Sequence, residues 1–249
     1  MEYRTLRLDI QAPLARITLS RPESGNRIDV RCVRELETAC DAIAASPDVV
    51  AVLVAADGPS FCAGWSQDIA SEGLGLDPFG PLAALPCPVL SAVQGDCVSA
   101  GLELALACDV RIAAEDARFG MPDVSQGSLP LAGGSQRLLR LAGRSVVTSM
   151  VLLGEILDAA AAYRAGLVSR VVPVGSLLGE AGAIAANVAS RGPLALRYAK
   201  EAVRQGLEMP LDQALRYELD LSVILQTTRD RDEGVQAFLE KRPPRFEGR

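Results

Sequence analysis

The sequence predicts an α/β fold in which helices cover both faces of a sheet. Residues 49–55 form a continuous apolar run, and residues 89–93 and 109–114 are further runs typical of buried strands. These runs alternate with stretches whose apolar residues recur at helical spacing, which favours a sheet between two helical layers. No Gly-x-Gly-x-x-Gly follows a strand and no Gly-Lys-Ser/Thr is present, so a nucleotide-binding α/β fold is the weaker interpretation.

The first third of the chain predicts a hairpin, a helix and a strand. Residues 3–10 and 14–20 have strand patterns, and Gln11-Ala12-Pro13 between them indicates a turn. Residues 21–27 form a loop. Residues 30–45 then show helical spacing, with Asp29 as the candidate N-cap. After the strand at 49–55, residues 71–81 are rich in Gly and Pro, which predicts a mobile flap.

The chain becomes mostly helical toward its end. A helix is expected at 135–141, and the chain is mostly helical from residue 144 onward. Asp158 is a good N-cap for a helix at 159–165, and Gly166 can end that helix. A strand is expected at 167–172. Helices are expected at 176–190, 194–205, 211–227 and 230–239. We therefore divide the chain into a core of residues 1–190 and a C-terminal helical region of residues 191–249.

Composition excludes several classes of function. The net charge of −6 and the pI near 4.9 argue against a nucleic-acid partner. No apolar stretch reaches the roughly 18 residues of a membrane span, and the N-terminus lacks a secretory pattern, so we expect a cytoplasmic protein without a membrane partner. The six cysteines have no Cys-x-x-Cys spacing, which favours buried reduced thiols.

The absence of histidine limits the available chemistry. It removes Ser-His-Asp and Cys-His catalysis as well as histidine metal sites, and we expect no metal. Acid–base catalysis must then come from carboxylates, Tyr, Lys or Cys.

The densest chemical pattern lies between residues 89 and 139. Three very small residues precede an Ala/Leu-rich stretch, which predicts a helix beginning near Ser99. The first backbone N–H groups of a helix lack internal partners, and residues as small as Ala100 and Gly101 let a ligand oxygen approach them. Backbone donors of this kind can form an oxyanion hole.

Two carboxylates accompany this helix start. Glu103 lies in its first turn, and Asp123 follows a Gly and a Pro on a predicted turn that can aim it back toward the helix. Taken alone, a Glu near a helix N-terminus is usually a surface residue favoured by the helix dipole, and a Pro-Asp pair is usually only a turn. The combined pattern favours a catalytic site.

This pattern resembles the crotonase superfamily, the enoyl-CoA hydratase/isomerase family. The similarity rests on three stretches, residues 92–103, Cys108 to Asp123 and Ala132-Gly133-Gly134-Ser135-Gln136-Arg137-Leu138, and it extends from Ser20-Arg21-Pro22-Glu23 to the tail. It implies a crotonase-like spiral of ββα units with a C-terminal helical oligomerisation region. It also implies an acyl-CoA thioester as substrate, no cofactor besides the coenzyme A of that substrate, and a homotrimer or hexamer.

The resemblance assigns roles to individual residues. Phe61-Cys62-Ala63-Gly64-Trp65 resembles the first oxyanion loop of the family, so the two backbone donors would be the N–H groups of Trp65 and Ala100. Glu103 and Asp123 match the two family carboxylates, although Asp replaces the usual Glu at the second. Trp65 is bulkier than the usual residue, and only its backbone is expected to act. The residues expected to bind substrate or coenzyme A are Arg27, Ala63, Gly64, Asp68, Gly101 and Lys241, with Arg21, Arg242 and Arg245 as further cations. Alternatively, the cations of the tail form only a solvated basic end.

The expected reaction is hydration of a 2-enoyl-CoA, in which one carboxylate activates water and the other supplies the α-proton. Double-bond isomerisation needs mainly one base at Asp123 and is the closest alternative. Decarboxylation and thioester hydrolysis rank lower, and a non-catalytic acyl-CoA-binding protein is an alternative of another class.

Overall fold

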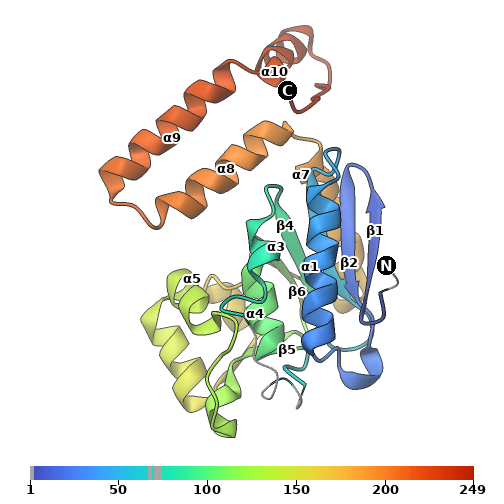
Figure 1. Ribbon diagram of the computed structural model, residues 1–249, viewed down its shortest axis with the longest axis vertical. Coiled ribbons are helices and arrows are strands. Elements are labelled where there is room, and N and C mark those ends of the chain that lie inside the picture. The colour runs from blue at the N-terminus through green and yellow to red at the C-terminus, as the bar shows by residue number, and fades with distance from the viewer. Residues whose placement is uncertain (1–2, 67–68, 70–74) are drawn as a thin grey trace.

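The computed structural model describes residues 3–66, 69 and 75–249. Its main sheet, shown in Figure 1, has six strands in the order β1-β2-β3-β4-β6-β9. The pair β1 and β2 is antiparallel and the other neighbouring strands are parallel. The strands are β1 (Leu6–Gln11), β2 (Leu14–Leu19), β3 (Ala51–Ala56), β4 (Val89–Val93), β6 (Val110–Ala114) and β9 (Arg170–Val172).

Strand β3 shows why the central strands are apolar without alternation. Val52 and Val54 belong to the core on the side of α1 (Val30–Ala44), whereas Leu53 and Ala55 pack in a second core with α7 (Leu177–Ala189). Successive strand residues point to opposite faces, so a sheet covered on both sides needs apolar residues at every position. The predicted α/β arrangement is confirmed, and Figure 1 shows α1 and α7 on opposite sides of the sheet.

A second, three-stranded sheet was not predicted. It contains β5 (Asp96–Val98), β7 (Arg118–Gly120) and β8 (Ile156–Asp158), with β5 parallel to β7 and β7 antiparallel to β8. Strand β5 begins at Asp96, with only two residues between it and the end of β4. Three-residue strands are too short to show an alternating pattern, so their pairing partners determine them.

Three helices are short, and one of them corrects the expected flap. These helices are α3 (Gly80–Ala84), α4 (Ala100–Ala107) and α6 (Ala159–Arg164). Residues 71–74 of the flap lie outside the described residues, and Gly80 and Pro81 belong to α3 instead. The 3-10 turns are η1 (Pro22–Ser24), η2 (Pro122–Gln126) and η4 (Val174–Ser176), and a π-helical turn, η3, spans Ser149–Leu153.

Helix α5 (Gly134–Thr148) is longer than the expected helix at 135–141. A non-helical residue, Gly143 with φ 79° and ψ 169°, interrupts it, and the chain continues as a helix beyond that kink. A glycine normally ends a helix, which explains why the sequence predicted only the first part.

Side-chain caps fix the helix starts that the sequence predicted. Asp29 accepts a hydrogen bond from the backbone N–H of Cys32 at 2.7 Å, and Asp158 accepts one from Ala161 at 2.7 Å. Gly166 has φ 72° just beyond α6. Both N-caps and this C-terminal glycine are therefore confirmed.

The last three helices lie at one end of the molecule, beyond the sheet (Figure 1). They are α8 (Pro193–Gly206), α9 (Leu211–Gln226) and α10 (Arg229–Glu240). Helix α8 is attached to the core by Lys200, whose Nζ lies 2.7 Å from Asp109 Oδ2, and by Arg204, whose guanidinium donates to the carbonyl of Ala83. Within the described part of the chain, no helix is both long and apolar enough to cross a bilayer.

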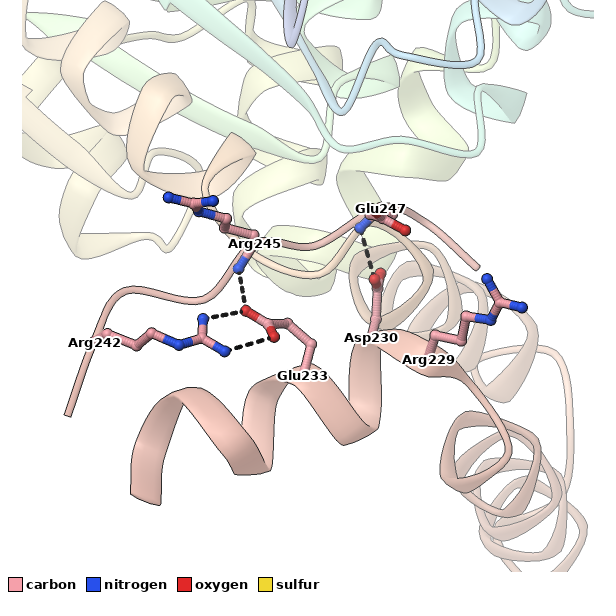
Figure 2. A pocket seen from close by; sticks show the side chains of 6 residues that line it. All are labelled: Arg229, Asp230, Glu233, Arg242, Arg245 and Glu247. Atoms are coloured by element: carbon pink, nitrogen blue, oxygen red, sulfur yellow. Dashed lines mark hydrogen bonds and ion pairs between the residues drawn. The ribbon is translucent and has the colours of Figure 1, made fainter. Parts of the chain in front are cut away.

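The C-terminal tail folds back along α10 through a network of charged groups. Both oxygens of Glu233 accept from the Arg242 guanidinium, at 2.6 and 2.9 Å, and the backbone N–H of Arg245 donates to the same carboxylate. Asp230 accepts from two further backbone N–H groups of the tail. Figure 2 shows the two carboxylates projecting from the helix toward the tail.

Candidate functional site

Two segments far apart in sequence meet at the N-terminus of α4. The backbone of Cys62 donates to the carbonyl of Asp96 at 2.9 Å and accepts from the N–H of Val98 at 3.1 Å. A Cβ on Gly101 would lie 2.4 Å from the Cys62 carbonyl oxygen, so only glycine permits this approach. Backbone contacts therefore place the loop after β3 against the first turn of α4.

The candidate oxyanion donors follow directly from this contact. A Cβ on Gly64 would lie 3.4 Å from Ser99 Cβ, so the residues preceding Trp65 and Ala100 are neighbours. Within the described part of the chain, the N–H groups of Trp65 and Ala100 make no hydrogen bond. Ser99 has φ 49° and ψ −120°, a sparsely populated conformation for a residue with a Cβ. The structure brings the two predicted donors to the same place.

A buried arginine holds the other end of α4. The guanidinium of Arg111 donates to the carbonyls of Ala105 and Cys108, at 3.1 and 2.6 Å, and to Leu167 at 2.7 Å. The last carbonyls of a helix have no internal partner, and a cation there complements the helix dipole. Arg111 thus fixes the helix whose first turn forms the site.

Glu103 is completely buried on α4, and three N–H donors hold its carboxylate. Oε1 accepts from the backbone of Ala132 at 2.7 Å and Gly134 at 3.0 Å, and Oε2 accepts from the indole Nε1–H of Trp65 at 3.1 Å. Burial raises the pKa of Glu103, the two backbone donors oppose this, and the charge of Asp123 raises it further. The two candidate carboxylates are thus close enough to interact electrostatically.

Asp123 lies in η2 and is also buried. The Ser99 hydroxyl donates to its Oδ1 at 2.5 Å, within the range expected for a hydroxyl and a carboxylate. Its Oδ2 is buried without a hydrogen-bond partner among the described residues. A buried carboxylate oxygen with no partner is unusual, and it is available to exchange a proton with a ligand.

The side chain of Trp65 takes part in the site, although only its backbone was expected to matter. The indole stacks on the ring of Phe79 with the centroids 5.7 Å apart and an angle of 8° between the planes. Phe79 is completely buried, whereas Trp65 is half-buried. The indole N–H reaches Glu103, so the aromatic pair forms a wall beside that carboxylate.

The other predicted binding residues divide into two groups. Arg27 is exposed and its guanidinium donates to the Trp65 carbonyl at 3.1 Å, beside the oxyanion loop that contains Ala63 and Gly64. The Ala63 N–H is used in the loop, where it donates to the carbonyl of Gly25. Asp68 lies outside the described residues.

Arg21 and one of the tail cations, Arg242, are engaged elsewhere, and Lys241 is distant from the site. Arg21 pairs with Asp29 at 2.5 Å, and Arg242 pairs with Glu233. Lys241 ends α10, near one end of the molecule, whereas β5, which leads into α4, lies near the other (Figure 1). The structure therefore does not bring Lys241 to the site of its own subunit.

The buried cysteines do not compete with the carboxylates as bases. Cys62 belongs to the candidate oxyanion loop and pairs with Cys97 in an isolated β-bridge, and burial raises the pKa of the Cys62 thiol to about 12. Burial also raises the pKa of Cys97 well above its ordinary value. Both thiols remain protonated near neutral pH, so carboxylates are left as the titratable groups of the site.

Sequence reasoning missed three contributors to the site. The Ser99 hydroxyl orients Asp123, and the backbone N–H groups of Ala132 and Gly134 hold Glu103. In the sequence, Gly133-Gly134 was only part of a stretch that resembles the family, and the pair was given no role in the site. A Cβ on Gly134 would lie 2.7 Å from Glu103 Cγ, and this close approach is the reason for glycine there. Glycines before a helix were a signal for such an approach.

Comparison with known proteins agrees with this geometry. The family model described as enoyl-CoA hydratase/isomerase matches residues 9–249. The chain is 39% identical to the 2,3-dehydroadipyl-CoA hydratase of Escherichia coli, over 94% of both chains, and 35% identical to a crotonyl-CoA hydratase of Syntrophomonas wolfei, over 99% of both. It is similar to the crystal structure of an enoyl-CoA hydratase from Bacillus anthracis, with a TM-score of 0.94, 33% identity and coverage of 99% and 100% of the two chains. The chain therefore belongs to the enoyl-CoA hydratase/isomerase family.

Proposed function

We propose that this protein hydrates 2-enoyl-CoA thioesters to 3-hydroxyacyl-CoA, and catalyses the reverse dehydration, with Glu103 and Asp123 as the acid–base pair. One observation carries the proposal: two buried carboxylates lie beside the start of α4, where two backbone N–H groups have no acceptor among the described residues. The named activities of the relatives support it.

The backbone donors act on the thioester carbonyl. The N–H groups of Trp65 and Ala100 bind its oxygen and stabilise the negative charge that develops there when the enolate forms. Losing one such donor costs on the order of a hundredfold in rate. Because these donors belong to the backbone, they need no reorganisation as the charge develops.

The two carboxylates move the protons of water addition. Glu103 accepts a proton from water as the water oxygen bonds to the β-carbon, and the electron pair of the double bond moves toward the α-carbon and the thioester oxygen. Asp123 then supplies a proton from Oδ2 to the α-carbon, while Ser99 holds its Oδ1. Glu103 releases the proton that it gained and Asp123 takes one up, through solvent, before the next turnover. The product has gained one water, and the reaction as written uses no cofactor besides the coenzyme A of the substrate.

Double-bond isomerisation is the second candidate, and the unpartnered Oδ2 of Asp123 favours it. One base can remove a proton from one carbon and return it to another, with the same oxyanion hole stabilising the intermediate. The two reactions differ in stoichiometry, because isomerisation leaves the mass of the substrate unchanged.

The test incubates the purified protein with a short 2-enoyl-CoA and a matched 3-enoyl-CoA. Loss of the conjugated thioester absorbance of the first, with a mass gain of one water, is the expected result. A rising absorbance from the second without a change of mass would replace hydration by isomerisation. No reaction with either would contradict both and favour a binding protein. The variants Glu103→Gln and Asp123→Asn are expected to bind the thioester without hydrating it.

We extend the proposal to assembly as a homotrimer or hexamer. Exposed apolar side chains recur at four-residue spacing along α9, at Leu211, Leu215 and Leu219, and Phe238 on α10 is 83% exposed. Faces of this kind on a monomer mark an interface. Association through these helices would also carry Lys241 to the coenzyme A of a neighbouring subunit.

Light scattering of the wild type and of Leu215→Glu tests the assembly. The wild type is expected to be trimeric or hexameric and the variant to dissociate, and a monomeric wild type would contradict the proposal. Lys241→Ala is expected to raise KM for the thioester with little effect on kcat.

We also propose that the protein is cytoplasmic. The six free cysteines support it, because reducing compartments keep thiols unpaired. Cell fractionation tests it, and recovery of the protein outside the cytoplasm would contradict it.

A further inference from the structure

The side chain of Trp65 contacts the carboxylate that carries the water step. Its Nε1–H donates to Glu103 Oε2 at 3.1 Å, and its ring stacks on the completely buried ring of Phe79. Stacking restricts rotation of the indole, which determines the direction in which the N–H points. A rigid donor therefore faces one oxygen of the candidate base.

The acceptor sites of Glu103 are then nearly all accounted for. An ionised carboxylate has about four lone-pair sites. The N–H groups of Ala132 and Gly134 occupy the two at Oε1, and the indole occupies one at Oε2. Among the described residues no further donor reaches Glu103, which leaves one site at Oε2 for a water that donates to this carboxylate.

We propose that Trp65 is a positioning residue for hydration: its indole N–H fixes the Glu103 carboxylate so that a single acceptor site receives the attacking water. This inference rests on the proposed function. Trp65 thereby acts twice, since its backbone N–H faces the thioester oxygen while its side chain orients the base. Because one residue has both roles, the position of Glu103 relative to the oxyanion hole is fixed.

The hydrogen bond also favours the ionised base. Burial of Glu103 raises its pKa, and the indole donor is one of the groups that oppose this shift. A hydrogen bond to the charged form stabilises that form. Without the indole N–H, Glu103 would therefore stay protonated to a higher pH, and less of the enzyme would have a competent base.

The first test removes the N–H and keeps the shape of the ring. Trp65 is the only tryptophan, so global replacement of tryptophan by benzothienylalanine changes this residue alone. We expect kcat to fall about tenfold, as for a hydrogen bond to a charged group. KM should change less than about threefold, and the acidic limb of the kcat/KM profile should move to higher pH. The variant W65F should show the same direction of change.

The second test does not depend on turnover. The emission of the sole tryptophan is expected to change with pH as Glu103 is protonated, and this transition should be absent in Glu103→Gln. Wild-type emission without such a transition, or one that persists unchanged in Glu103→Gln, would overturn the inference.

The two proposals fail in different ways. An unchanged kcat and pH profile after benzothienylalanine replacement, with Glu103→Gln inactive, would overturn the role of Trp65 and leave hydration standing. Full activity of Glu103→Gln would instead overturn the assignment of the base. A merely structural role of Trp65 would lower the amount of folded protein without shifting the pH profile.

Discussion

The substitution Gly134→Ala is expected to separate activity from stability. The new Cβ would lie 2.7 Å from Glu103 Cγ and 2.6 Å from Met121 Cε, whereas ordinary contacts begin at 3.4 Å. The end of a methionine side chain can move, but Glu103 is held by three hydrogen bonds. Raising the distance between the new Cβ and Glu103 Cγ from 2.7 to 3.4 Å requires Glu103 and α5 to move apart by about 0.7 Å. Because a misplacement of about 1 Å can cost a hundredfold, kcat/KM should fall roughly 20- to 50-fold.

The stability cost of the same change should be small. Gly134 has no positive φ and begins a helix, so alanine gains about 0.5–1 kcal/mol from backbone entropy. Overpacking costs about 1–3 kcal/mol, which leaves a net loss of about 0–2.5 kcal/mol in the free energy of unfolding.

The assay is steady-state hydration of a short 2-enoyl-CoA, with denaturant unfolding measured in parallel. Gly182→Ala in α7 is the matched control, because its Cβ would meet no atom within 4 Å. The control should keep wild-type kcat/KM and gain about 0.5–1 kcal/mol. Wild-type kcat/KM in Gly134→Ala would refute the reasoning that this glycine sets the position of Glu103.

Four further predictions follow from the same contacts. Ser99→Gly removes the hydroxyl that holds Asp123 and relieves the positive φ, so kcat should fall about tenfold while the thermal midpoint does not fall; an unchanged kcat would contradict the role of the hydroxyl. Because burial raises the pKa of Glu103, the acidic limb of kcat/KM should lie above the ordinary value of about 4.3, with activity lost as pH falls through it; a limb below that value argues against Glu103 as base. Trp65→Ala opens the aromatic wall and should raise kcat/KM for aryl-substituted enoyl thioesters at least about tenfold relative to short ones, and an unchanged ratio places the acyl group elsewhere. The hydrogen-bonded Arg242 guanidinium lowers the pKa of Glu233 to about 2, so the stability from this pair is fully present above about pH 4.3 and is lost as pH falls toward about 2. Glu233→Gln should therefore speed tryptic cleavage of the tail at neutral pH. Equal cleavage rates for the variant and the wild type would contradict this prediction.

The sequence predicted the elements whose pattern is long and local. The boundaries of α1 and of α7 to α10 agree with the expected ranges to within one or two residues, because helical spacing and caps such as Asp29 act over only a few neighbours. The strand at 89–93 was predicted with its observed bounds. The three-residue strands of the second sheet were missed, since pairing alone determines them.

The candidate site was predictable to a smaller extent. Family resemblance pointed to Glu103, Asp123 and the two backbone donors, and the structure gathers them around α4. The contact of the Trp65 indole with Glu103 joins residues 38 positions apart, and that of Gly134 with Glu103 joins residues 31 apart. No local pattern encodes such contacts, because they depend on how α4, α5 and the loop after β3 pack together.

The backbone contacts between Cys62 and β5 determine which parts of the site can tolerate substitution. The spacing of the two candidate oxyanion N–H groups is set by main-chain hydrogen bonds and by one glycine, so it is insensitive to most side-chain replacements. The wall beside Glu103 is instead made by the side chain of Trp65, supported by the buried ring of Phe79, and substitution can reshape both rings. Libraries that vary these two rings should therefore alter acyl selectivity and the setting of Glu103, while the two backbone groups proposed to bind the thioester keep their places.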